Sequence, residues 1–128
     1  MYYLNPRRKW SGRELIVAYD ERFPLFTGFK NNSSCIVRFF ERGNCAGNRY
    51  HKIRGEMMLP IQGSFEIFLE DINTGKRDSF LIDLKENVAF YVGVGIAHAM
   101  KSREVQGLIL EMAAVPARES DIFPHPIA

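Results

Sequence analysis

Short apolar or alternating runs recur along the whole chain, and each is bounded by glycine, proline, asparagine or aspartate. Runs of this length between turn residues are typical of β-strands. In the run 64–70, Phe65, Ile67 and Leu69 alternate mostly with polar residues, a period of two that a helix does not show. The remaining runs are 14–19, 25–29, 35–40, 57–61, 80–84, 88–92 and 108–112.

Strands that follow one another with almost no helix between them predict an all-β domain, either a sandwich or a closed barrel. Residues 71–76 contain Asn73, Thr74 and Gly75 and predict a hairpin loop. The one helical signal is a turn or two after Val115, where Pro116 suits a first helical position.

The length of 128 residues fits one domain, and a hydrophobic share of 46% is enough for a packed core. We therefore predict a single domain over 1–128, with a basic N-terminal arm at 1–13 and a C-terminal tail at 116–128. The net charge of +2 is small for a nucleic-acid-binding protein, so we expect no nucleic-acid partner. The arm could touch phosphates, although a solvated terminus is the simpler interpretation; its cations are Arg7, Arg8, Lys9 and Arg13.

The sequence also predicts a cytoplasmic protein with no membrane partner. The N-terminus has no apolar core of a signal peptide, and no apolar run approaches the ~18 residues of a membrane span. Cys35 and Cys45 are too few for a disulfide framework and are not spaced as CxxC. We interpret both as reduced thiols in a reducing compartment.

Several polar residues lie between Gly43 and Gly63 at a distinctive spacing. Arg49 and His51 are two apart on what should be one strand, so their side chains face the same side. Glu56 can return to that side after a bend at Gly55. This stretch resembles the first motif of the cupins in every spacing. The matching positions are Gly43, Arg49, His51, Glu56 and Gly63. Arg49 stands where that motif has its first histidine.

The stretch 93–98 resembles the second cupin motif, a loop that ends in a histidine, here His98. The resemblance implies the cupin double-stranded β-helix, a jelly-roll barrel. It also implies that the two motifs lie on neighbouring strands that open on one cavity, so that His51 and His98 face each other.

A narrower resemblance covers about residues 34–123. It rests on Tyr50-His51-Lys52, on 65–69 with the glycine before it, and on 90–92 leading to 95–100. These segments resemble the dTDP-4-keto-6-deoxyglucose 3,4-ketoisomerases and, more distantly, the dTDP-4-keto-6-deoxyglucose 3,5-epimerases. The resemblance implies an isomerase or epimerase of nucleotide-linked 4-keto sugars that works by acid and base catalysis without a cofactor.

Such an enzyme removes a proton next to a ketone and returns a proton to a neighbouring carbon. His51, with an ordinary pKa of about 6.5, is the expected base. Arg49 would hold the negative charge of the enolate, because a guanidinium stays protonated. His98 and Tyr91 are the candidates for returning the proton.

The expected ligand is a nucleotide sugar. Glu56 would orient a histidine or bind a sugar hydroxyl, and Arg38 and Arg54 would bind the diphosphate. The alternative is a non-catalytic or regulatory cupin that binds a small ligand. In that case His51, Glu56 and His98 could hold a divalent metal such as Fe, Zn, Mn or Ni, although the fixed charge of Arg49 opposes a nearby dication.

The strand that begins near Glu56 is apolar on both faces. Met57, Leu59 and Ile61 lie on one face, and Met58 lies on the other beside Glu56. A strand of this kind is covered on both faces, so a second sheet, the N-terminal segment or a partner subunit must lie outside it. A homodimer with an isologous interface is the simplest source of that cover.

Overall fold

The computed structural model describes residues 6–10, 13–16, 33–83 and 90–128. The regular elements in this part of the chain are β-strands and one short 3₁₀ turn, η2 (Glu119–Asp121). The strands are β1 (Pro6–Trp10), β2 (Arg13–Ile16), β3 (Ser33–Phe39), β4 (Cys45–Tyr50), β5 (Glu56–Gln62), β6 (Ser64–Asp71), β7 (Arg77–Asp83), β8 (Phe90–Val92), β9 (Ile96–Ser102), β10 (Gly107–Ala113) and β11 (Phe123–Pro124).

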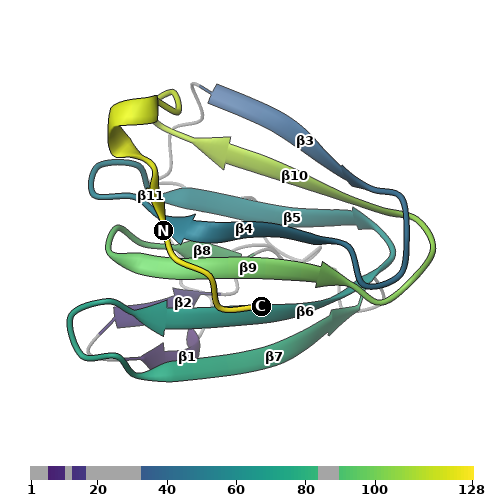
Figure 1. Cartoon of the computed structure of the whole chain (residues 1–128), viewed down its shortest axis with the longest axis horizontal. Helices are drawn as coiled ribbons and strands as arrows, with labels where there is room; N and C mark the ends of the chain where they lie inside the picture. The colour runs from purple at the N-terminus through teal and green to yellow at the C-terminus, as the bar shows by residue number, and fades with distance from the viewer. Residues whose placement is uncertain (1–5, 11–12, 17–32, 84–89) are drawn as a thin grey trace.

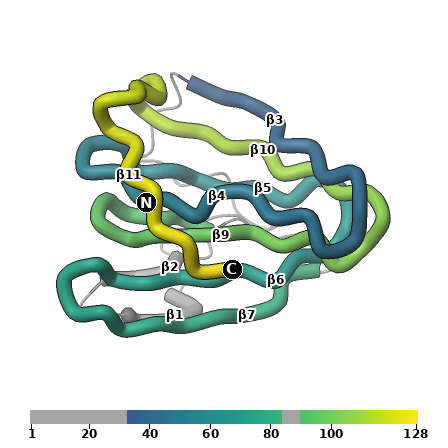
Figure 2. Tube along the Cα trace, in the orientation of Figure 1, coloured from purple at the N-terminus to yellow at the C-terminus, as the bar shows by residue number. Residues whose placement is uncertain are grey.

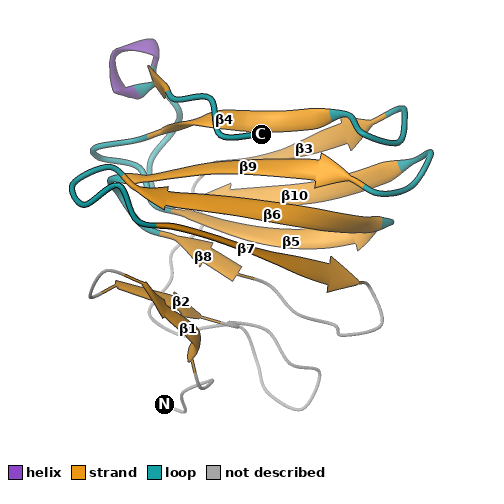
Figure 3. Ribbon diagram, turned by 60° about the horizontal axis from the view of Figure 1, so that its bottom comes forward, coloured by secondary structure: helices purple, strands orange, loops and turns teal. Residues whose placement is uncertain are grey.

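The strands form two antiparallel sheets that face each other (Figures 1 and 3). One sheet has the order β3-β10-β5-β8, and the other has the order β11-β4-β9-β6-β7. A separate hairpin of β1 and β2 lies beside β8. This arrangement confirms the all-β jelly-roll barrel predicted from the sequence.

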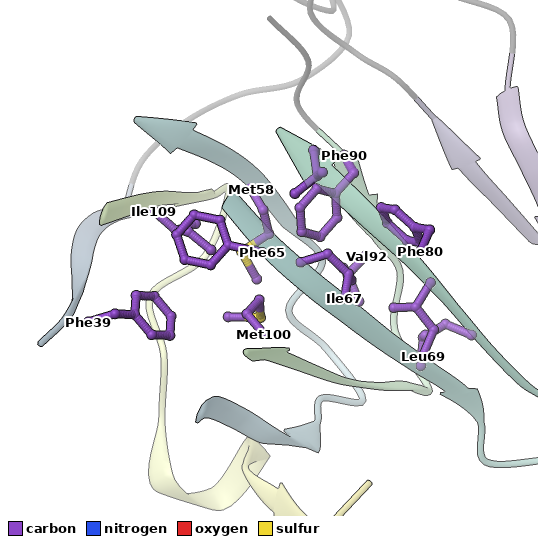
Figure 4. Packing of buried hydrophobic residues seen from close by; sticks show 12 residues of the cluster. Phe39, Met58, Phe65, Ile67, Leu69, Phe80, Phe90, Val92, Met100 and Ile109 are labelled. Carbon is purple, nitrogen blue, oxygen red and sulfur yellow. The ribbon is translucent and has the colours of Figure 1, made fainter. Parts of the chain in front are cut away.

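The core fills the space between the two sheets (Figure 4). The period-two alternation in β6 points Phe65, Ile67 and Leu69 inward, where each is at most 3% exposed. The facing sheet contributes Met58 and Ile109, both fully buried. These core side chains therefore come from runs that the sequence pattern predicts to be strands.

The predicted elements agree with the structure in most of the described chain. The loop at 72–76 joins β6 to β7 in an antiparallel pair, as predicted for a hairpin. The helical signal after Val115 corresponds to the 3₁₀ turn, and no described helix is long and apolar enough to cross a membrane. The predicted run 25–29 lies outside the described residues.

One prediction about the second motif is wrong in detail. His98 was expected at the end of a loop, but β9 begins at Ile96, so His98 lies inside a strand. The strand continues because it is hydrogen-bonded on both sides, to β4 and to β6. Strand β4 has no alternation of apolar and polar residues, and its pairing with β9 holds it in the sheet.

A bulge in β4 sets the position of Arg49. The register shifts between Gly47 and Arg49, and Arg49 then pairs with His98. Gly47 has φ 94° and Asn48 has φ 56°, both in the left-handed region. A Cβ on Gly47 would lie 2.6 Å from the carbonyl oxygen of His98, so the bulge depends on glycine at this position.

We predict that Gly47→Ala destabilises the fold more than Gly43→Ala. Gly43 has a similar φ of 88°, and a Cβ there would meet no atom within 4 Å. The control should therefore lose only the ~1–2 kcal/mol of a left-handed alanine. Gly47→Ala should lose a further ~1–3 kcal/mol from steric overlap with β9. Denaturant unfolding measures both, and equal losses would contradict this account of the bulge.

Candidate active site

A buried carboxylate, that of Glu56, lies at the centre of a polar cluster between the two sheets. Glu56 opens β5 and is 1% exposed. Its Oε1 lies 3.1 Å from His51 Nε2 and 3.2 Å from His98 Nε2. Its Oε2 lies 3.3 Å from Arg54 Nε. Three cationic or ionisable groups therefore surround one carboxylate that solvent does not reach.

Both sheets supply this cluster. His98 comes from β9, His51 follows the last residue of β4, and Glu56 comes from the facing sheet. The two imidazole rings have their centroids 6.2 Å apart. Arg49 pairs with His98 across β4 and β9, so the two side chains share the inner face. The structure thus brings together the four residues at the motif positions.

The hydrogen bonds at Nδ1 fix how each histidine presents its Nε2. His51 Nδ1 lies 2.8 Å from the carbonyl oxygen of Asp121, and His98 Nδ1 lies 3.2 Å from that of Ile96. A carbonyl only accepts, so each Nδ1 carries the hydrogen and donates it. Each Nε2 therefore faces the cluster, and neither has a hydrogen bond of good geometry to any described residue.

The cluster shifts the pKa of His51 upward. Burial alone would lower this pKa, but the Glu56 carboxylate and the Asp121 carbonyl outweigh burial. The pKa of Glu56 moves the other way: burial alone would raise it, but His51 and His98 hold it well below its ordinary value. The pair can therefore keep Glu56 ionised while His51 gains and loses a proton.

Asp121, in the C-terminal tail, holds the loop that carries His51. Its Oδ1 accepts hydrogen bonds from the backbone N–H groups of Lys52 at 2.8 Å and Ile53 at 3.0 Å. Its Oδ2 accepts one from the backbone N–H of Arg54 at 3.1 Å. Burial raises the pKa of Asp121, but these three bonds lower it by more. We call this arrangement, from Asp121 to the backbone of 52–54 and to His51, the tail clasp.

The tail itself is fixed along the outer surface of β4 (Figure 2). Phe123 stacks on Tyr50 with ring centroids 5.1 Å apart. Asn48, in the bulge, accepts hydrogen bonds from the backbone N–H groups of Ile127 at 2.8 Å and Ala128 at 3.0 Å. His125 contacts the Glu70 carboxylate on β6.

Three predicted site residues take other places. Arg54 is 3% exposed and directs its guanidinium to Glu56, to Ser33 Oγ at 3.3 Å and to the Val115 carbonyl at 2.6 Å. Arg38 pairs with Leu108 and is exposed on the outer face of its sheet. Tyr91 pairs with Met57, so its side chain lies on the face opposite to Glu56. The structure does not bring Arg38 or Tyr91 into the cluster.

Sequence reasoning missed two residues of this region. Asp121 lies far from the motifs, and its only signal is an acidic residue in an otherwise unremarkable tail. Glu111 lies on β10 and is 3% exposed. Its signal was available, because it is a single acid in the apolar run 108–113 with the parity of Ile109.

The residues do not fit a metal centre. Among the described residues, no group of three or more His, Cys, Asp or Glu side chains is arranged to hold a metal ion. Both imidazoles approach the same oxygen of Glu56, and Arg54 takes the other oxygen. The guanidinium of Arg49 adds a fixed positive charge on the same face.

Comparisons with known proteins identify the fold. No model of a protein family matches the sequence, and no curated protein matches it. Among solved structures, a sugar 3,4-ketoisomerase from Thermoanaerobacterium thermosaccharolyticum in complex with TDP is 17% identical, with 74% of this chain and 67% of that chain covered and a TM-score of 0.66. A 3,4-ketoisomerase from Helicobacter canadensis is 18% identical, with 75% and 70% covered and a TM-score of 0.67.

A dTDP-4-dehydrorhamnose 3,5-epimerase from Bacillus anthracis, with TDP and PPi bound, is also similar. It is 11% identical, with 78% of this chain and 68% of that chain covered and a TM-score of 0.68. The structural neighbours are thus dTDP-sugar ketoisomerases and epimerases with the cupin fold, as the sequence resemblance implied. At this level of identity the comparison shows that the chain has a cupin jelly-roll fold.

We predict that Asp121→Ala loosens the tail clasp. The variant removes the acceptor of three backbone N–H groups and should lower the free energy of unfolding by on the order of 2–3 kcal/mol. Glu119→Ala, an exposed acid in the same 3₁₀ turn, is the matched control and should change stability little. Denaturant unfolding distinguishes the two, and equal effects would show that the clasp contributes nothing.

The same pair of proteins gives a prediction about pH. Because the pKa of Asp121 is lowered by folding, its contribution is complete above the unfolded value of about 3.9 and is lost as the pH falls through the folded value. The stability difference between wild type and Asp121→Ala should therefore shrink below about pH 4. A difference that stays constant into acid would contradict an ionised clasp.

Proposed function

We propose that this cupin-fold chain is an isomerase or epimerase of nucleotide-linked 4-keto sugars, and that it works by proton transfer next to the ketone. One observation carries the proposal: His51 and His98 present their Nε2 atoms, 3.1 and 3.2 Å away, to one buried oxygen of Glu56. Two imidazoles beside a shared carboxylate in the buried interior of the barrel suit the removal and return of a proton.

His51 is the proposed base. Its Nε2 takes the proton from the carbon next to the ketone, and the electron pair of that C–H bond moves to form the enolate. The ketone oxygen then carries the negative charge, which the Arg49 guanidinium stabilises from the same face. The raised pKa of His51 helps it to accept the proton, since the imidazolium forms beside ionised Glu56.

His98 is the proposed acid. In epimerisation the electron pair returns from the enolate oxygen, and His98 Nε2 supplies a proton to the same carbon from the opposite face. In isomerisation the hydroxyl on that carbon gives its proton to the former ketone oxygen, the new C=O forms there, and His98 Nε2 supplies the proton to the former ketone carbon.

His98 enters this step as an imidazolium, because its Nδ1 hydrogen is donated to the Ile96 carbonyl. The proton that His51 took returns to His98 through Glu56 Oε1, which lies 3.1 and 3.2 Å from the two Nε2 atoms. His98 takes this role alone, because Tyr91 lies on the other face of its sheet. The carbon that receives the proton decides between isomerisation and epimerisation, and the position of His98 relative to the sugar sets that choice.

The proposal of a nucleotide in the ligand is based on the structural neighbours. The ketoisomerase and the epimerase described above hold TDP, so we propose a dTDP sugar for this chain. Arg38 stays a predicted diphosphate ligand, although its exposed side chain lies on the outer face of its sheet, away from His51 and Glu56. Arg54 instead holds Glu56 in position, because its guanidinium already donates to Glu56 and to the Val115 carbonyl.

We predict that His51→Asn lowers turnover by about 10²–10⁴, the loss typical of a positioned base, with dTDP affinity unchanged. NMR of the sugar product measures turnover, and calorimetry measures affinity. His125→Asn, a histidine in the tail, is the control and should keep wild-type turnover. Wild-type turnover in His51→Asn would remove His51 as the base.

Arg49→His separates this proposal from the metal-binding alternative, because it restores the first histidine of the cupin motif. We expect the variant to lose isomerase activity and to gain affinity for divalent metal, as measured by elemental analysis after dialysis. Unchanged turnover would show that Arg49 does not stabilise the enolate. Tight metal in wild-type protein without stabilisation by dTDP would support the alternative.

We also propose that the protein is a homodimer through the outer face of the first sheet. Ile36, Leu110 and Leu59 pair in one row across β3, β10 and β5, and Ile36 is 59% exposed. The outer face of the other sheet instead pairs Glu66 with Lys101. An apolar row with an exposed isoleucine at its edge suits an isologous contact with a second copy.

Ile36→Asp should convert the dimer to a monomer, because two-fold symmetry places the new charge in the contact twice. Leu81→Asp, at a residue 51% exposed on the other sheet, should leave the mass unchanged. Light scattering at micromolar concentration measures the mass. A wild-type monomer would remove the dimer and leave the catalytic proposal intact.

A further inference from the structure

Glu111 is a second buried carboxyl group inside the barrel. It lies on β10 opposite Met58 and Cys35, and it shares the inner face with Met58, whose side chain is fully buried. Ala113 pairs with Glu56 two residues further along the same strand. Glu111 and Glu56 therefore lie on one face of adjacent strands, diagonal to each other.

The cluster gives Glu111 no cation of its own. The cationic or ionisable groups of the cluster, namely His51, His98 and Arg54, all lie against Glu56. Glu111 Oε1 has no hydrogen-bond partner among the described residues. The described partner of Oε2 is a weak donor, the thiol of Cys35 at 3.5 Å.

The groups that act on Glu111 come from every neighbouring strand. They are Cys35 on β3, Glu56 on β5, Arg49 on β4 and His98 on β9. A buried acid next to an ionised carboxylate, with no backbone N–H bonded to it, is far more stable with its proton. Consistently, burial first and the Glu56 charge second raise the pKa of Glu111, and the more distant Arg49 and His98 do not reverse the shift.

Arg49 also has an unused donor. Its Nε is buried and has no partner within the described chain. A neutral carboxyl group and a guanidinium are both donors. Here each has a buried atom without a hydrogen-bond partner among the described residues, Glu111 Oε1 and Arg49 Nε. Two such donors, held by strands of opposite sheets, suit one anionic oxygen of a ligand.

We propose that Glu111 retains its proton and, with Arg49, donates a hydrogen bond to the substrate oxygen that becomes negative when the proton next to the ketone is removed. This inference rests on the proposed function and adds a catalytic residue to it. Glu111 keeps its proton throughout the reaction, so Glu111 does not have to be reprotonated after each turnover. Its effect is to hold the enolate charge.

The edge of the first sheet lies next to Glu111. Strand β3 is that edge, and Cys35 is exposed although its register with Glu111 places it on the inner face. The inference places the entry of the sugar at this edge, past Cys35, so that the sugar meets Glu111 before it reaches His51 and Glu56.

The proton on Glu111 can be tested without turnover. Infrared difference spectra of wild type minus Glu111→Gln, near neutral pH, should show the C=O band of a protonated carboxyl group. Bound dTDP-4-keto-6-deoxyglucose should shift that band, because the O–H then donates to the sugar. Carboxylate bands in place of the C=O band would overturn the inference.

Turnover then tests the role of the proton. Glu111→Gln keeps a donor and should retain most of the wild-type turnover. Glu111→Met has the length but no donor, and should lose about 10²–10³ in kcat, as when one donor to an oxyanion is removed. Cys35→Ala, which removes the described partner of Glu111, should match wild type. Equal turnover in Glu111→Met and wild type, or equal losses in the Met and Gln variants, would overturn the inference.

A stability measurement excludes a purely structural explanation. Glu111→Met should unfold at the same temperature as wild type or higher, since replacing an unsatisfied buried acid with an apolar side chain removes a cost. A large loss of stability together with the loss of turnover would assign Glu111 to the fold. If wild type itself turns over no 4-keto sugar nucleotide, the proposed function fails as well; if only the Glu111 variants behave as wild type, the inference about Glu111 fails alone.

Discussion

The charge of Glu56 is the constraint on which the other parts of the site depend. A carboxylate that is 1% exposed is stable only when cations and donors surround it. His51 and Arg54, from the loop between β4 and β5, and His98, from β9, meet that need. Burial alone would raise the pKa of Glu56, but the two histidines hold it below its ordinary value. The same charge raises the pKa of His51 and favours the neutral form of Glu111. One buried charge therefore acts on the groups that we propose as base, acid and donor.

The C-terminal tail makes this arrangement possible. His51 has its Nε2 toward Glu56 only because its Nδ1 donates to Asp121, and Asp121 in turn holds the backbone of 52–54. The tail is anchored to the β4 bulge through Asn48, which also receives the backbone N–H of His125 at 2.7 Å. The bulge that sets Arg49 against His98 is thus the bulge that anchors the tail. A fold of this kind couples the last residues of the chain to the chemistry at its centre.

The sequence could predict what depends on local pattern. Period-two alternation predicted the strands of the core, because strand parity fixes side-chain direction. The spacing of Arg49, His51 and Glu56 predicted that the three side chains meet, but by the wrong route: β4 ends at Tyr50, before His51, and Glu56 lies on the facing sheet. The sequence could not place Tyr91 or Arg38, because the inner or outer face of each follows from a register with Met57 or Leu108 that only the folded sheet defines. Asp121 and Glu111 were missed for a related reason: each acts through contacts with residues about 70 or more positions distant, such as the bond from Cys35 to Glu111 across 76 positions.

The central claim is that this site removes a proton from the carbon next to a ketone. Incubation of wild-type protein in D₂O with a panel of dTDP, UDP and GDP 4-keto sugars, followed by NMR of the recovered sugar, tests it directly. The account predicts deuterium at a carbon adjacent to the ketone of at least one sugar, and loss of that exchange in His51→Asn. Absence of exchange into every sugar of the panel would contradict the enzymatic account and leave a cupin that binds a ligand without transforming it.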